Sequence, residues 1–216
     1  MMDGYSFHTT NECLDNTYNQ YYQAYANIFN RIGINFKTVK ADNGQMGGTN
    51  SHEFMALAEI GEDTIVYEKD AELAFNLEVA PVYFEKAASK GILNDVEEMA
   101  TPDVKTIDGL VSTYDLDVKD LIKAVLYDID GKLVMALLRG DHEANEIKVL
   151  KTVGGQLIDM ASNELLVAHD IIPGFVGPIG AHSDITIVVD QALQDVESGV
   201  CGANKLDTHF TGINFD

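Results

Sequence analysis

Apolar side chains near the start of the chain recur at the spacing of one helix face. Between residues 9 and 33 they return every three or four positions, which predicts an amphipathic α-helix. Thr9 and Glu12 have the spacing of a capping box at its start. Gly33 supplies a stop signal at its end.

Shorter apolar runs come after this helix and predict strands. They cover residues 34–41, 52–58 and 64–67, and a polar, glycine-rich loop separates the first two. Residues 71–90 have a helical pattern again. The composition then changes at residues 100–102, where we place a domain boundary.

The second half opens on a strong hairpin signal. Residues 124–129 and 132–138 flank Asp130-Gly131, a dipeptide typical of two-residue hairpin turns. Just before them, Asp117 is placed to cap a short helix that we expect to run to Lys123.

The remainder mixes element types without a regular alternation of strand and helix. Residues 143–151 predict a helix, whereas residues 165–168 and 185–189 predict strands. Gly174–Gly180 lies between those strands as a loop. The pattern as a whole indicates an α+β fold.

The composition narrows the functional classes. The formal net charge of −21 repels phosphate at long range and argues against a general nucleic-acid binder, so any contact with RNA has to be local. Cys13 and Cys201 indicate neither a disulfide framework nor a zinc site. The start lacks the features of a signal peptide, and no apolar run is long enough to cross a bilayer. We therefore expect a soluble, cytosolic protein.

Common catalytic motifs are weak in this sequence. None of the six histidines forms a His-Glu-x-x-His motif, so no metal site is predicted. The Gly44–Gly48 loop lacks the Lys-Ser/Thr of a phosphate-binding loop, and no Gly-x-Ser-x-Gly elbow is present. Cys201 is best interpreted as a buried structural thiol. Gly177-Pro178 with Gly180 could still let backbone N–H groups approach a ligand closely.

The stretch from Arg139 to Lys148 holds the most informative polar residues. Asn145 and Lys148 lie three positions apart and share a helix face. A lysine beside a Gly-Asp turn could hold a phosphate or a ribose as a point charge. A solvated amphipathic helix explains the same pattern, and the residues by themselves favour that alternative.

Ordered motifs in the first half carry a family resemblance. They are Met2–His8, Leu14-Asp15 with Ala24-Tyr25, Ile28-Phe29-x-Arg31-x-Gly33, Ala41-Asp42-x-Gly44-x-x-Gly47-Gly48-x-x-Ser51-His52-Glu53-Phe54-Met55, and Gly61–Ile65. Together they resemble the end of motif 2 and the following signature of bacterial-type prolyl-tRNA synthetases, which are class II enzymes.

The second half resembles the insertion domain of the same enzymes, which is related to the YbaK-type aminoacyl-tRNA deacylases. The motifs are Arg139-Gly140-Asp141-His142 with Asn145-Glu146-x-Lys148, Gly174-Phe175-x-Gly177-Pro178-x-Gly180, and Gly202-Ala203-Asn204 with His209-x-x-Gly212-Ile213-Asn214. The resemblance implies a partial class II antiparallel-sheet catalytic region at residues 1–100. It implies a YbaK-like mixed α/β editing domain at residues 101–216.

The chain also departs from the family pattern. Motif 1, the first strand of motif 2, motif 3 and the anticodon-binding domain are absent, and position 2 is Met where the family leads us to expect Lys. We therefore expect an internal piece of a larger enzyme that does not form prolyl-adenylate. In the full-length ligase the resemblance implies ATP and Mg²⁺ as cofactors and a homodimer.

The resemblance implies editing as the function of residues 101–216. A synthetic site that admits proline cannot strongly reject the smaller alanine, so a second site would hydrolyse alanyl-tRNA for proline. The partner would be the acceptor end of tRNA(Pro), with no membrane and no cofactor involved. The residues implied as catalytic are Lys148, His209 and Asp190, and those implied for substrate binding are Asn145, Gly174, Gly177, Pro178 and Gly180.

Roles can be assigned within this set. Lys148 would bind the 3′ end, and the glycine-rich loop would aim backbone N–H groups at the developing oxyanion. His209 and Asp190 would be pocket walls or orienting groups, although Asp190 ends a predicted strand and could simply cap the next turn of the chain.

Two other functions stay open. One is a non-catalytic structural or tRNA-docking piece. The other is a metal-dependent hydrolase, with His142, His169, Asp170 and Asp184 as the ligands.

Overall fold

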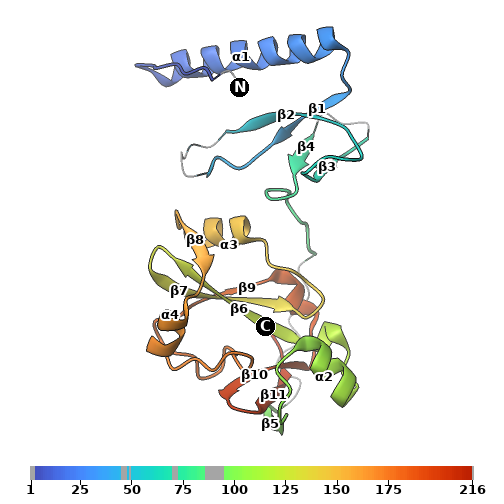
Figure 1. Ribbon diagram of the computed structural model, residues 1–216, viewed down its shortest axis with the longest axis vertical. Coiled ribbons are helices and arrows are strands. Elements are labelled where there is room, and N and C mark those ends of the chain that lie inside the picture. The colour runs from blue at the N-terminus through green and yellow to red at the C-terminus, as the bar shows by residue number, and fades with distance from the viewer. Residues whose placement is uncertain (1–2, 45–47, 49, 70–72, 86–94, 216) are drawn as a thin grey trace. The chain divides into compact units, whose positions relative to one another are not determined.

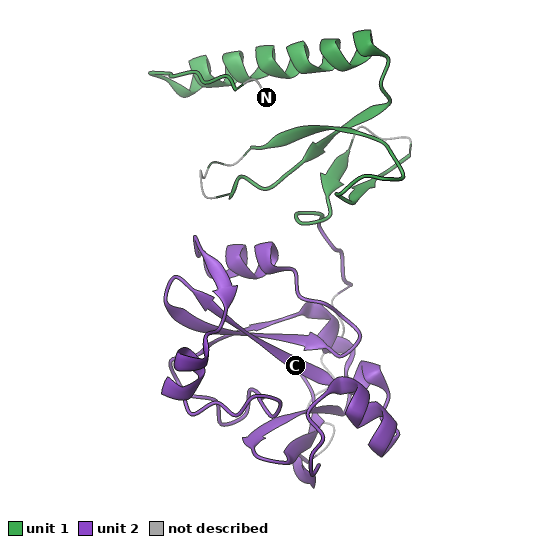
Figure 2. Cartoon of the chain, in the orientation of Figure 1, with its two compact units in different colours: residues 1–80 green, residues 81–216 purple. Residues whose placement is uncertain are grey.

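The computed structural model describes residues 3–44, 48, 50–69, 73–85 and 95–215 (Figure 1). The chain divides into two compact units, residues 1–80 and residues 81–216 (Figure 2). The change in composition near residue 100 thus falls inside the second unit. Residues just before it, Glu97–Ala100, form strand β5, which pairs within that unit.

The first unit begins with helix α1, Asn11–Ile32. Its N-cap is Thr10, whose side chain accepts a hydrogen bond of 3.2 Å from the backbone N–H of Cys13. The cap is thus one residue later than the Thr9 that the sequence predicts. Gly33 ends the helix in the left-handed region, at φ 78°, as predicted.

Four short strands form the sheet of the first unit, in the order β2-β1-β4-β3. Strands β1 and β4 pair in parallel and the other neighbours are antiparallel. Their bounds are Phe36–Lys40 for β1, His52–Ala56 for β2, Ile65–Tyr67 for β3 and Ala74–Asn76 for β4. The first three agree with the predicted strands.

Strand β4 shows that the helix predicted over residues 71–90 is wrong at these positions. Ala74 and Asn76 are buried while Phe75 is less so, which is the alternation of a strand. A short apolar run has no periodicity of its own that separates a strand from a buried helix. Residues 77–85 form no helix either, and the other residues of that prediction, 71–72 and 86–90, lie outside the described residues.

Helix α1 contacts this sheet through aromatic rings. Phe29 lies 5.2 Å from Phe36 and 5.9 Å from Phe54 between ring centroids, and Tyr22 lies 5.1 Å from Phe54. Even so, no residue of the helix is buried. Two of the aromatic residues that repeat along α1, Tyr21 and Tyr25, are exposed.

The main sheet of the second unit has the strand order β8-β6-β7-β9. Strands β6 and β7 form the predicted hairpin, with Ile129 opposite Lys132. Asp130 and Gly131 both have positive φ, 53° and 79°, as a type I′ turn requires. The bounds are Ile122–Ile129 for β6, Lys132–Arg139 for β7, Ile158–Met160 for β8 and Thr186–Val189 for β9.

A second sheet has the order β10-β11-β5 and is antiparallel throughout. Strand β10 spans Gly199–Lys205 and β11 spans Thr208–Ile213. Strand β5 pairs with β11, with Ala100 opposite Thr208. The first and last strands of the unit are therefore neighbours.

Short helices complete the second unit. They are α2, Ile107–Tyr114; the 3₁₀ helix η2, Val118–Asp120; α3, Glu146–Val153; α4, Asn163–Ala168; and the 3₁₀ helix η3, Gln191–Asp195. The main core cluster joins β6 and β7 to η3 and the second sheet, through Ile122, Met135, Leu137, Leu193, Cys201 and Ile213 among others.

Two helix predictions in this unit need correction. Asp117 does cap η2, by accepting a hydrogen bond from the Lys119 N–H at 2.9 Å, but the turn ends at Asp120 and Lys123 already lies in β6. The strand predicted over residues 165–168 is part of α4, which Ser162 caps. A run of only four apolar residues is consistent with either element.

Candidate functional site

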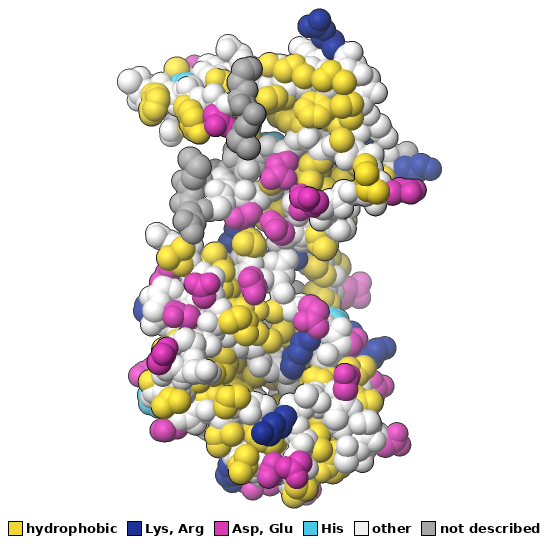
Figure 3. All heavy atoms as spheres, in the orientation of Figure 1, with side chains coloured by type: hydrophobic (Ala, Val, Ile, Leu, Met, Phe, Trp, Pro, Cys, Tyr) yellow, Lys and Arg dark blue, Asp and Glu magenta, His cyan; other side chains and the backbone are white. Residues whose placement is uncertain are grey.

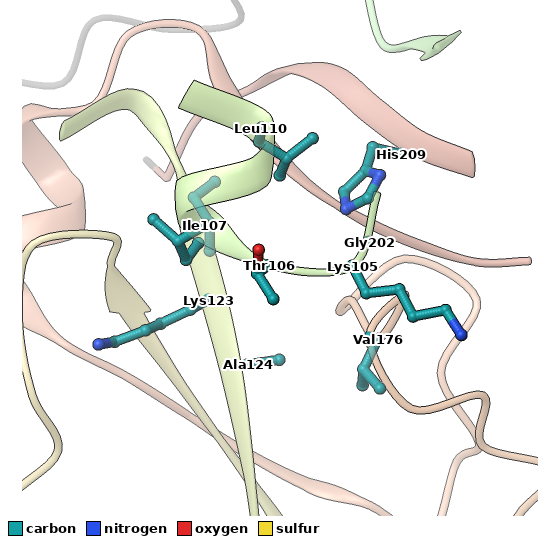
Figure 4. A pocket seen from close by; sticks show the side chains of 11 residues that line it. Lys105, Thr106, Ile107, Leu110, Lys123, Ala124, Val176, Gly202 and His209 are labelled. Carbon is teal, nitrogen blue, oxygen red and sulfur yellow. The ribbon is translucent and has the colours of Figure 1, made fainter. Parts of the chain in front are cut away.

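A cavity of about 120 Å³ lies between the start of α2, strand β6, residues 174–180 and the second sheet (Figure 4). Residues 174–180 are called the glycine loop below. Apolar groups and a few polar ones line the cavity: Ile107, Leu110, Ile122, Ala124 and Val176, with Gly174, Gly202, Lys105, Thr106, Lys123 and His209. A small hollow that combines apolar walls with convergent polar groups is a candidate binding site for a small ligand.

His209 is the most deeply buried polar side chain of this wall, with 4% of its surface exposed. Its Nδ1 lies 2.6 Å from the hydroxyl of Thr101, which is fully buried. The ring of Phe175 meets its ring edge-on at 5.5 Å. Burial lowers the pKa of His209 below its ordinary value of 6.5, so the imidazole is neutral at neutral pH.

Two lysines lie at the cavity. Lys123, on β6, has 18% of its side chain exposed and its ammonium donates to Glu143 at 2.9 Å. Lys105 packs its aliphatic stem against Gly174. Figure 4 shows the two lysines on different sides of the cavity. A ligand held there would meet positive charge in a chain that is otherwise strongly acidic.

Asn204 holds the glycine loop in place. Its side-chain oxygen accepts from the Gly177 N–H at 3.1 Å, and its amide donates to the carbonyls of Gly177 at 2.8 Å and Ile179 at 2.9 Å. Its own N–H donates to the Phe175 carbonyl at 2.8 Å. The Gly177 N–H is therefore engaged within the protein, whereas Gly174 and Val176 face the cavity.

Close backbone contact explains two glycines of this site. A Cβ at Gly177 would collide with the Gly202 carbonyl, and a Cβ at Gly202 would collide with the backbone of Phe175 and Val176. Only glycine allows the loop and strand β10 to approach this closely. The spacing of glycines in the sequence thus reflects packing as well as the cavity wall.

The other predicted site residues lie elsewhere. Asn145 is the N-cap of α3 and accepts from the Lys148 N–H at 3.1 Å. Lys148 is half-buried on α3 and lines neither this cavity nor a larger one at the other end of the glycine loop. Asp190 caps η3 by accepting from the Ala192 N–H at 2.7 Å, which is the simpler alternative for this carboxylate.

Lys123 is one of the cavity residues that the sequence did not predict. The sequence pattern puts it at the end of a short helix, where a lysine is unremarkable. A lysine within an apolar strand is a stronger signal of a functional site, because charged side chains are rarely buried in a protein core. A strand that begins at Ile122 instead of residue 124 would have revealed it.

A second cavity, of about 290 Å³, involves the other end of the glycine loop. Gly180, Val176 and Asn204 line it, together with His169, Asp170 and His182 and the apolar residues Met135, Ile171, Ala181 and Ile185. Val176 is common to both cavities.

The described residues form no group of three or more His, Cys, Asp or Glu side chains placed to hold a metal ion. Of the ligands proposed for a metal site, His142 contacts Arg139 at 2.9 Å, whereas His169 contacts the ring of His182. In the same part of the chain, no helix is long and apolar enough to span a bilayer.

Comparisons with known proteins agree with this architecture. Residues 101–216 match the family model of the aminoacyl-tRNA editing domain. A solved structure, the hypothetical protein APE2540, aligns with 54% of this chain and 79% of its own, at a TM-score of 0.50 and 16% identity. The chain belongs to the aminoacyl-tRNA editing domain family, and the predicted mixed α/β fold is confirmed.

Curated relatives extend the likeness to the first unit. The chain is 45% identical to the proline–tRNA ligase of Geobacillus thermodenitrificans (strain NG80-2) over its whole length. It is 43% identical to the proline–tRNA ligase of Bacillus subtilis (strain 168) over 99% of its length. It spans only 38% of either relative. The predicted resemblance to bacterial prolyl-tRNA synthetases is thereby confirmed.

Proposed function

We propose that the second unit hydrolyses alanyl-tRNA for proline and so removes a wrongly attached amino acid. The observation that carries this proposal is the cavity of about 120 Å³ walled by Ile107, Leu110 and His209. Its size suits a small side chain. A hydrophobic pocket discriminates one methylene by only about 1–3 kcal/mol, so exclusion of the larger proline would come from the rigidity of these walls.

The chemistry needs few groups. A water oxygen attacks the ester carbonyl carbon, and the bond from that carbon to the ribose oxygen breaks. The ribose oxygen takes up one proton of the water and becomes a hydroxyl. The amino acid leaves as a carboxylate, and the second proton passes to solvent. Because the ester is activated, holding water and carbonyl in the right geometry supplies much of the rate.

The residues of the cavity would share this work. The neutral imidazole of His209 would offer one ring nitrogen to the amino group or to the attacking water. Lys123 and Lys105 would attract the phosphates of the single-stranded 3′ end as point charges. The prediction that Lys148 holds the 3′ end stays a prediction, and it competes directly with Lys123.

Single-turnover deacylation of alanyl-tRNA(Pro) tests this proposal with matched variants. We expect Lys123→Ala to slow the reaction roughly 10- to 100-fold, as for the loss of one charged hydrogen bond. Lys148→Ala removes the same side chain outside the cavity, and we expect the rate to change little.

Two other outcomes of this experiment would contradict the proposal. A large loss with Lys148→Ala alone would assign the binding of the 3′ end to Lys148 and not to Lys123. A folded chain that leaves alanyl-tRNA intact would favour the non-catalytic, tRNA-docking function instead.

Ligation of proline to tRNA, with ATP and Mg²⁺, is a separate proposal. It concerns proteins of the length of the relatives, of which this chain spans 38%.

A further inference from the structure

Helix α1 carries an apolar stripe on a side that the sheet of the first unit leaves open. The stripe consists of Leu14, Tyr21, Tyr25, Ile28 and Ile32, whose exposed fractions are between 40% and 64%. Steps of three, four or seven positions separate these residues, so they lie along one side of the helix, as in packed helix pairs. Figure 3 shows apolar atoms on the visible surface along α1.

The middle of α1 has no charged side chain. Between Asn16 and Asn30 the helix contains no Asp, Glu, Lys or Arg, although the whole chain has a formal net charge of −21. An exposed helix normally carries charged residues on its solvent side. Two copies of so acidic a chain repel each other, so a surface through which they can associate has to be free of charge. The apolar stripe meets this condition.

The stripe projects past the edge of the neighbouring sheet. Phe29 of α1 reaches as far as Phe36 of β1, whereas Tyr25, which belongs to the stripe, contacts Phe54 of β2. Strand β2 is the edge strand, and in the described part of the chain it pairs only with β1. The side of the stripe that continues around the helix from Tyr25 therefore overhangs this edge.

Strand β2 directs backbone groups outward along the same edge. The Leu57 N–H donates to the Asn35 carbonyl at 2.9 Å, so every second residue counting back from Leu57 bonds to β1. The residues between them point their N–H and C=O groups away from β1, as in any antiparallel ladder. His52, Phe54 and Ala56 thus offer donors and acceptors to a further strand.

We propose that the first unit binds a second copy of this chain through the α1 stripe and the β2 edge. A two-fold axis beside β2 would make both β2 and α1 antiparallel to their copies and would join the two sheets into one. The helix pair would bring Leu14 level with Ile32 of the second copy. It would also bring Glu12, in the first turn of one helix, to the same end as Arg31, in the last turn of the other.

The exposed apolar area is comparable with that of a stable interface. The stripe is extended by Tyr5 and Phe7, which are 74% and 95% exposed, in a segment that lies against the helix where Gly4 meets the ring of Tyr21. Because an aromatic residue buries about 150–250 Å², these side chains together offer on the order of 800 Å². A standard protein interface buries about 800 Å² on each partner.

Sedimentation of the full chain tests this proposal. Over about 1–100 µM the chain should associate reversibly to twice its mass of 23.6 kDa. Ile28→Glu places a charge in the stripe of both copies and should raise the dimer dissociation constant at least about 100-fold. Asn27→Glu adds the same charge one position away, outside the stripe, and should change the constant little. A chain that stays at 23.6 kDa throughout would overturn the proposal and leave the stripe to a different polypeptide.

Hydrogen exchange supplies a second readout, which needs no substitution. The amide hydrogens of His52, Phe54 and Ala56 should exchange slowly in the dimer and rapidly once the parent chain is diluted to the monomer. Ile32→Glu is a second variant, at the most exposed position of the stripe, and should separate the copies without changing the helical circular dichroism. A dimer whose β2 amides exchange as fast as those of the monomer, or which persists in both glutamate variants, would contradict this interface.

Discussion

At the scale of single residues, the contact between Thr101 and His209 joins two buried polar groups that are 108 positions apart. The distance of 2.6 Å between hydroxyl and Nδ1 fixes the ring orientation and leaves Nε2 for the cavity. Thr101 touches the proposed substrate only through His209, so it is a positioning residue.

Replacing Thr101 tests this role. Thr101→Val removes the hydroxyl but keeps the shape, and it leaves a buried ring nitrogen without its partner. We expect a loss of about 1–3 kcal/mol in the free energy of unfolding, measured by urea denaturation. Thr101→Ser keeps the hydroxyl and should restore both the stability and the ¹⁵N signature of the His209 tautomer. Equal behaviour of the Val and Ser variants would show that the hydroxyl is not needed.

The buried imidazole also predicts a pH dependence. Because the pKa of folded His209 is lowered from 6.5, the unfolded chain takes up a proton first as the pH falls through that value. Stability that His209 contributes is therefore present above about pH 6.5 and decreases as the pH falls toward the folded pKa. The difference in unfolding free energy between the parent and His209→Asn should change over this window. A constant difference would contradict the assigned direction of the pKa shift.

The sequence predicted only some of the residues that line the cavity. His209 was predicted and lies in the cavity wall, whereas Lys123 was missed because the pattern makes its strand two residues too short. Asp190 and Asn145 are caps of local elements. Polar residues next to element ends have such local roles so often that sequence alone cannot separate them from ligand contacts.

At the scale of elements, the contact of the glycine loop with β10 controls the shape of the smaller cavity. A Cβ at Gly177 would meet backbone that cannot move aside, whereas a Cβ at Gly180 would meet open space. The positive φ of Gly180, 75°, still costs an alanine about 1 kcal/mol.

Alanine substitutions can separate these two effects. We expect Gly177→Ala to lower the free energy of unfolding by roughly 1–3 kcal/mol or more and to slow deacylation, because the loop has to shift. Gly180→Ala should cost less than Gly177→Ala in urea denaturation. The reverse order would mean that the loop and strand are not held in close contact.

Elements were predicted well where the signal is local. The β6–β7 hairpin is predicted by its two turn residues, and α1 by its long periodicity and the glycine that ends it. The predictions at β4 and α4 were wrong, because elements of three to six residues are too short to show a periodicity. Strands β10 and β11 were not predicted; the partner of β11 in β5 is distant in the sequence and gives no local signal.

At the scale of the whole molecule, the two units differ in how completely they bury their apolar residues. In the second unit every residue from Leu133 to Leu138 of β7 is buried. In the first unit α1 buries none, and Tyr21, Tyr25, Ile28 and Ile32 are among its exposed large side chains. Yellow apolar atoms appear on the visible surface along this helix in Figure 3. An exposed apolar face of this kind usually has a partner surface.

This contrast predicts that the second unit folds and acts without the first. Residues 81–216 expressed alone should unfold cooperatively and should hydrolyse alanyl-tRNA at a single-turnover rate within about twofold of the full chain, because all residues of the proposed site lie within that unit. Prolyl-tRNA serves as the control substrate and should be hydrolysed much more slowly. A loss of activity on removal of residues 1–80 would assign the first unit a part in catalysis.

The pairing of β5 with β11 has an evolutionary consequence. The start of β5, Glu97, lies opposite Thr211 near the end of β11, so the first and last strands of this unit bring the two ends of the fold next to each other. Such a module can be inserted at a surface turn of another protein without disrupting that protein's fold. The same geometry would allow such a module to fold either as an insertion within a larger protein or as a separate chain.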